Sequence, residues 1–228
     1  MPITCDRLVI PPGSTLTIQA NWDEFNDILQ ELGDRRSSHI AYQNNQLDIM
    51  VPLPAYTTAK GDLEEFIEIL FAEFGTNYRS LGSVTLQNAG KLVGIEPGNC
   101  FYIQNSAGNF AEDIDPKPQE AFLNLENAPP PDLVLEIDIS SRNYLDIYAE
   151  LGVPEVWHYS EESVRIKRLD VENKTYQVQW NSQYFHGLLL SEALPLYLER
   201  IETDGHKRTM NLFQAWVREQ LGKASVVE

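Results

Sequence analysis

Three carboxylates stand at positions of the same parity in one short apolar segment: Asp132, Glu136 and Asp138. Residues two apart in a β-strand share a face, so all three acids are expected on one side of a strand. A shielded row of acids is costly unless a cation neutralises it, and Mg²⁺ or Mn²⁺ is the hard cation that carboxylates prefer. The pattern predicts a magnesium or manganese site, and the alternative is a strand face that is simply exposed to water.

The rise of a strand limits which of these acids could share one ion. At ~3.3 Å per residue, Asp132 lies about 13 Å from Glu136, whereas Asp138 lies only about 6–7 Å from it. A complete site therefore needs an acid from another element, and Glu96, beside Pro97 at a strand boundary, is the leading candidate. Three weaker candidates lie on a predicted helix: Glu64, Glu65 and Glu68.

The elements that must position these acids follow from hydrophobic spacing. Apolar residues three and four apart predict helices over 22–32 and 63–74, each closed by a glycine. Residues 40–43 and 47–50, separated by Asn44-Asn45, predict a hairpin. The remaining strands are expected at 83–87, 92–95, 100–104, 132–139, 156–159, 164–169 and 176–180. Further helices are expected at 144–151, from an N-cap at Ser191 through 201, and at 210–221. This order has no regular βαβ repeat and predicts an α/β or α+β fold with helices packed on a mixed sheet.

Several segments around the acids resemble one known family. They are Pro131–Ile137, Tyr148–Trp157, Leu47–Pro52, Gly82-Ser83 and Glu96–Ile103. In this order they are similar to the Uma-type family of putative restriction endonucleases, part of the PD-(D/E)XK nuclease superfamily. The resemblance implies a restriction-endonuclease-like fold, a four- or five-stranded mixed β-sheet flanked by helices. It also implies a homodimer, and the chain length makes residues 1–228 a single domain by default.

The resemblance further implies Mg²⁺-dependent hydrolysis of DNA phosphodiester bonds, in which the metal activates a water and neutralises the phosphate. Glu136 matches the acid of the motif strand, but the motif aspartate is Gly98 and the motif lysine is Tyr144. In an active enzyme Glu136, Glu96 and Asp138 would be the catalytic and metal-binding residues. The alternative is a catalytically degenerate member that acts as a non-enzymatic binding or scaffold protein.

Composition restricts the function further. The chain is 43% hydrophobic and 10% aromatic, enough for a buried core. Thirty-four acidic and 17 basic residues give a net charge of -17, which disfavours DNA as a partner unless a local basic surface exists. The densest basic group comprises Arg165, Lys167 and Arg168, with Lys174 nearby. Pairing with the many acids is its simpler use, and contact with nucleic acid is the alternative.

Cysteine usage and hydropathy give the expected compartment. The two cysteines, Cys5 and Cys100, exclude a disulfide framework and a four-thiolate zinc site. No apolar run approaches the ~18–20 residues that span a bilayer, and the first residues lack a signal-peptide pattern. We therefore expect a cytoplasmic protein that makes no membrane contact.

Overall fold

The computed structural model describes residues 9–33, 38–104, 110, 122–137 and 144–224. Its helices are α1 (Trp22–Leu32), α2 (Pro54–Glu73), α3 (Leu145–Leu151), α4 (Leu190–Asp204) and α5 (His206–Ala224), with a short 3₁₀ turn at Ala89–Lys91. None of the helices in these ranges is both long and apolar enough to cross a membrane.

The strands form two six-stranded mixed sheets. The first sheet has the order β1 (Ser14–Gln19), β3 (Gln46–Val51), β2 (His39–Gln43), β6 (Val93–Ile95), β5 (Thr85–Asn88) and β8 (Phe122–Asn124). The second has the order β12 (Thr175–Gln179), β11 (Ser163–Asp170), β10 (Glu155–Ser160), β9 (Leu133–Ile137), β7 (Asn99–Ile103) and β4 (Tyr78–Gly82). Each sheet has one parallel pair, β5/β8 and β9/β10 respectively, and its other pairs are antiparallel.

This architecture confirms the predicted α/β class with a mixed sheet and flanking helices. The expected count of four or five strands was too low, because the strands are divided between two sheets of six. Strands β1, β4 and β8 were not predicted. Helix α2 begins at Pro54, nine residues before the predicted start, because Pro54 occupies the first turn, where a missing N–H costs nothing.

Local sequence accounts for the first helix and the first hairpin. The Asn21 side chain accepts from the backbone N–H groups of Asp23 and Glu24, both at 3.0 Å, while the Glu24 carboxylate accepts from the Asn21 N–H at 2.8 Å. This capping box fixes the start of α1. Asn44 and Asn45 both adopt positive φ, 56° and 57°, which matches the twist of a two-residue hairpin turn between β2 and β3.

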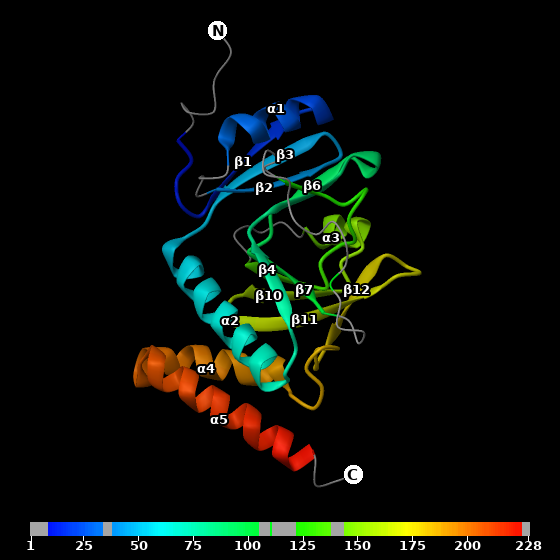
Figure 1. The fold of residues 1–228 in the computed structure, drawn as a ribbon. Coiled ribbons are helices and arrows are strands. Elements are labelled where there is room, and N and C mark those ends of the chain that lie inside the picture. The colour runs from blue at the N-terminus through cyan, green and yellow to red at the C-terminus, as the bar shows by residue number, and fades with distance from the viewer. Residues whose placement is uncertain (1–8, 34–37, 105–109, 111–121, 138–143, 225–228) are drawn as a thin grey trace.

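The molecule is layered around the second sheet. Figure 1 shows α2, α4 and α5 on one side of that sheet and the first sheet with α1 on the other. One buried cluster joins α2, α4 and α5 to the helix-facing side chains of the second sheet, among them Leu133, Leu135 and Ile137 of β9. A second cluster joins both sheets and α3, and it contains Val134. The alternation predicted for β9 is therefore confirmed.

The predicted cap of α4 is wrong. The helix begins at Leu190, so Ser191 lies inside its first turn. The Ser191 hydroxyl donates instead to the backbone oxygen of Trp180, at 3.2 Å. A hydrogen bond to a neighbouring segment has replaced the local capping bond, and it ties the start of α4 to the end of β12.

A buried carboxylate joins β10 to the segment that precedes α4. Glu155 is fully buried, and it accepts from Trp157 Nε1 at 2.7 Å, from Ser182 Oγ at 2.6 Å and from the Gln183 N–H at 2.9 Å. Burial raises the pKa of Glu155, while these donors and the charge of Arg168 oppose the rise. Three donors therefore depend on one acceptor that water does not reach.

We predict that Glu155→Ala lowers the free energy of unfolding by at least about 3 kcal/mol, because it leaves two buried donors and one half-buried donor without an acceptor. Urea denaturation at pH 7 measures the change. Glu192→Ala, at an exposed position of α4, is the control and should change it by less than about 0.5 kcal/mol. Equal effects of the two variants would contradict the structural role of Glu155.

Candidate active site

Glu136 lies on β9, the strand at the centre of the second sheet, and its half-buried side chain faces α3. The hydroxyl of Tyr148, a fully buried residue of α3, donates a hydrogen bond to the Glu136 carboxylate. Burial and the adjacent carboxylate raise the pKa of Tyr148 well above its ordinary value, so the phenol stays protonated and remains a donor. Glu136, the acid that matches the motif, is thus hydrogen-bonded to a tyrosine that packs among apolar side chains.

The connection between β9 and β10 brings Tyr148 to this position. Helix α3 ends at Gly152, whose φ of 84° is typical of a glycine C-cap, and a short turn then leads into β10. Because β9 and β10 are parallel, the helix must cross the face of the sheet between them. Its residues Ile147, Tyr148 and Leu151 pack into the cluster shared by the two sheets.

Gly98 lies directly before β7 and packs closely against β9. The pairing of β7 with β9 ends at Asn99, which pairs with Leu135. A Cβ atom at position 98 would lie 2.8 Å from the Leu135 carbonyl oxygen and 3.4 Å from Cγ1 of Ile137. At the position that the resemblance assigns to the motif aspartate, the backbone of β9 therefore fills the space that a side chain would need.

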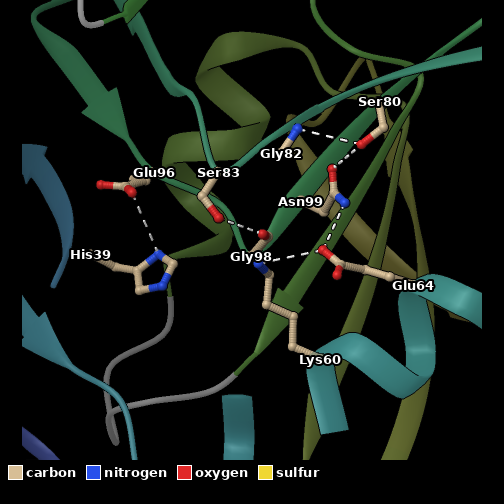
Figure 2. Close-up of polar contacts among 9 residues, drawn as sticks. All are labelled: His39, Lys60, Glu64, Ser80, Gly82, Ser83, Glu96, Gly98 and Asn99. Carbon is tan, nitrogen blue, oxygen red and sulfur yellow. Dashed lines mark hydrogen bonds and ion pairs between the residues drawn. The ribbon is translucent and has the colours of Figure 1, made fainter. Parts of the chain in front are cut away.

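Glu96 directs its carboxylate to the first sheet. Its Oε1 lies 4.0 Å from Nδ1 of His39 on β2, and its backbone N–H donates to the Ile40 oxygen at 2.9 Å. Figure 2 shows the Glu96 side chain reaching His39 and pointing away from Glu64 and Asn99. The structure thus gives the predicted second ligand a histidine partner at the junction of the two sheets.

The other predicted acids are divided among different places. Asp132 accepts from the Ile103 N–H at 2.7 Å, burial raises its pKa, and it lies at the far end of β9, as the strand spacing predicts. Glu64 accepts from Asn99 Nδ2 at 2.7 Å and lies 3.4 Å from Lys60 Nζ. Asp138 lies outside the described residues.

Glu64 belongs to a polar network on the helix side of the second sheet. The Ser80 hydroxyl donates to Asn99 Oδ1 at 2.8 Å, so Ser80, Asn99, Glu64 and Lys60 form one chain of contacts (Figure 2). Asn99 shares its face with Phe101, which packs against α2, whereas Glu136 faces α3. Glu64 and Glu136 therefore approach the sheet from opposite faces. No sequence signal identified Ser80 or Asn99, apart from the position of Asn99 beside Gly98.

Tyr144, which matches the motif lysine, occupies the N-cap position of α3 without a side-chain capping bond. Its hydroxyl donates to Asp48 Oδ2 at 3.2 Å, and the buried Asp48 also accepts from Thr17 Oγ1 at 2.6 Å. The position of the motif cation thus carries a neutral donor that links α3 to the first sheet. The predictions from sequence missed Asp48 and Thr17, because nothing in the chain shows that β1, β3 and α3 meet.

The described residues do not fit a divalent ion. In this part of the chain no three His, Cys, Asp or Glu side chains are grouped closely enough to hold a metal. Glu136 accepts from Tyr148, and Glu96 lies beside His39. Position 98, between them in sequence, offers no side-chain ligand atom.

The predicted basic group is divided between the two faces of the second sheet. Arg165 pairs with His158, and His158 pairs with Glu136 on the parallel strand β9, so these three share a face. Lys167 Nζ lies 3.3 Å from His158 Nδ1 on that face. Arg168 instead pairs with Glu155 on the helix side. Lys174 Nζ lies 2.9 Å from Glu150 Oε2, as the pairing interpretation predicts.

A comparison with protein families matches most of the chain. Residues 22–203 match the model of the Uma2 family, whose description is "Putative restriction endonuclease". The chain belongs to this family. The match confirms the resemblance on which positions 98, 136 and 144 were assigned.

Comparisons with solved structures and with curated proteins add little to the Uma2 match. The structure is similar to the crystal structure of a putative nuclease belonging to DUF820 from Anabaena variabilis ATCC 29413. The two share 14% sequence identity with a TM-score of 0.49, over 78% of this chain and 98% of that chain. No curated protein matches the chain.

We predict that Gly98→Ala lowers the free energy of unfolding by about 1–3 kcal/mol, because the new Cβ would press against the Leu135 carbonyl oxygen. Thermal and urea denaturation measure the change. Gly61→Ala is the matched control: it lies within α2 with nothing near its Cβ position, and should be neutral or stabilising by up to about 1 kcal/mol. Neutral behaviour of Gly98→Ala would contradict the close approach of β7 to β9.

A pH-dependent loss of stability is expected from His158. Burial, Lys167 and Arg165 lower the pKa of His158 from 6.5 to about 4. Between these values the unfolded chain binds a proton that the folded chain does not, so stability falls as the pH drops from 6.5 to 4. We expect His158→Gln to reduce this loss by on the order of 1 kcal/mol. Urea denaturation of both proteins at pH 7 and pH 4.5 tests this, and parallel losses would contradict it.

Proposed function

We propose that this Uma2 protein does not cleave DNA, and that it uses the nuclease-family fold as a binding or scaffold protein. The observation that carries the proposal is the geometry at Gly98. The resemblance assigns the motif aspartate to this residue, and the carbonyl oxygen of Leu135 lies 2.8 Å from the position that a Cβ would take there. The packing around Gly98 therefore leaves no room for the carboxylate that the motif would place there.

Metal-dependent hydrolysis has requirements that the described side chains do not meet. A divalent ion needs several oxygen ligands that converge and leave a coordination position for water. Glu136 accepts from Tyr148, and Glu96 lies beside His39. The motif lysine, which would orient or deprotonate the water, is replaced by Tyr144, a neutral donor to Asp48. Glu136, Glu96 and Tyr144 each contact a residue of another element instead.

The opposing hypothesis is a Mg²⁺-dependent DNA endonuclease that uses Glu136, Glu96 and Asp138. The description of the Uma2 family supports this hypothesis, and so does the retained acid at position 136. The net charge of -17 opposes it, because long-range repulsion slows the approach of a polyanion. Arg165 and Lys167 share a face with Glu136, but Arg168 does not add to them.

We expect no metal-dependent cleavage of supercoiled plasmid or of single- and double-stranded oligonucleotides. With 10 mM Mg²⁺ or Mn²⁺, the cleavage rate should stay within about tenfold of the rate in an EDTA control. Calorimetric titration of Mn²⁺ should show no saturable binding that depends on Glu136. Glu136→Gln keeps an acceptor for the Tyr148 hydroxyl and should leave both measurements unchanged. Glu192→Gln, at an exposed acid of α4, controls for the loss of one negative charge. Cleavage or Mn²⁺ binding that disappears only in Glu136→Gln would overturn the proposal in favour of the endonuclease.

A further inference from the structure

The outermost strand of the second sheet is unprotected. In the described part of the chain, β12 pairs with β11 alone and ends the strand order of its sheet. An antiparallel edge strand turns every second residue's N–H and C=O away from its single neighbour. Val178 in β12 is 66% exposed, and Trp180 directly after the strand is 69% exposed. Unpaired backbone groups and two large apolar side chains therefore meet along one edge.

The usual protections of an edge strand are missing from this segment. Residues 175–180 read Thr-Tyr-Gln-Val-Gln-Trp, with no charged residue and no proline in a chain that is 22% charged. The pairing of β11 with β12 is continuous from Ile166–Gln179 to Asp170–Thr175, with no bulge. Natural proteins use charges, prolines and bulges to stop such edges from pairing with another strand. The composition of β12 is therefore typical of a strand that can pair with a further strand.

The other sheet edges differ from β12. Strand β4 contains Arg79 and has an irregularity between Ser80 and Gly82. Strand β8 has only three residues. Strand β1 is uncharged, but its apolar Leu16 and Ile18 are half-buried against the cluster of the first sheet, and its exposed residues are polar. Among these edges, β12 alone presents large exposed apolar side chains.

We propose that β12 of one copy pairs antiparallel with β12 of a second copy about a two-fold axis, which joins the two second sheets into one. A two-fold pairing gives each edge the same partner and closes the assembly at two copies. The antiparallel arrangement also brings opposite charges near one another. The turn before β12 carries the exposed Glu172, and the strand beside its far end carries the exposed Arg165, so the turn of each copy lies towards Arg165 of the other.

The two-fold arrangement also buries the exposed apolar groups. Val178 and Trp180 stand two positions apart, on the same face of the edge, and in the joined sheet they lie beside residues of the second copy. A second copy is favoured over a nucleic acid here because the edge itself is uncharged and the chain carries -17. The pairing is independent of the proposed function, since its test reads molecular mass and not cleavage.

The test is sedimentation equilibrium of the full chain at 1–100 µM. Wild type should sediment as a dimer of the 26.0 kDa chain. Val178→Lys should raise the dissociation constant at least about 30-fold, because it places one charge from each copy in the joined edge. Thr15→Lys places the same charge on an exposed site of edge strand β1 and should leave the dimer intact. Circular dichroism and melting temperature confirm that both variants fold.

Three outcomes would overturn the pairing: a monomeric wild type at 100 µM, a dimer that persists in Val178→Lys, or a dimer that Thr15→Lys disrupts as strongly. Salt provides a second measurement. Two copies of charge -17 repel each other, so an uncharged edge should pair more tightly at 500 mM than at 50 mM NaCl.

Discussion

Strand β9 is enclosed on all sides, and this constraint governs the candidate site. It pairs with β7 and β10, its helix-facing residues pack beneath α2, and its other face packs on α3 and the first sheet. Protein interiors are close-packed, so a strand held in this way cannot shift to admit another group. The contact between Gly98 and the Leu135 backbone is a direct consequence. The place where the nuclease motif needs an aspartate has become part of the core.

The same enclosure determines how the acids are used. A buried or half-buried carboxylate must be stabilised by hydrogen bonds or by positive charge. A neutral protein group donates to each of three carboxylates: Tyr148 to Glu136, Tyr144 to Asp48, and the Ile103 N–H to Asp132. The bonds of Asp48 and Asp132 join segments that are distant in the sequence, and the bond of Glu136 joins β9 to the next element, α3. These carboxylates therefore act as acceptors that hold the sheets and α3 together.

The alternation of side chains along β11 also determines the face of the sheet on which each basic residue lies. Arg165 and Lys167 point to the side of Glu136, while Arg168 points to the side of Glu155. A run that looks dense in the sequence is thus divided between two surfaces, each with its own acids. The second sheet keeps one uncharged and exposed edge at β12.

Much of the fold could be predicted from the sequence because it depends on local patterns. The capping box and terminal glycine of α1, the Asn-Asn turn of the first hairpin and the alternation of β9 are each contained within a few residues. The order of motifs was also sufficient to indicate the Uma2 family. The substitutions Gly98 and Tyr144 were visible as departures from its pattern.

The tertiary structure alone decided which of these residues meet. Glu96 and Glu136 are forty positions apart, and their side chains take partners on different elements because the register of β6, β7 and β9 fixes their directions. Strand β4, the division into two sheets and the contact of Tyr144 with Asp48 likewise depend on pairings between distant segments. Local spacing specifies the face on which a side chain lies. Its neighbours depend on how distant strands align and on how closely their backbones can approach, and no local pattern in the chain records either.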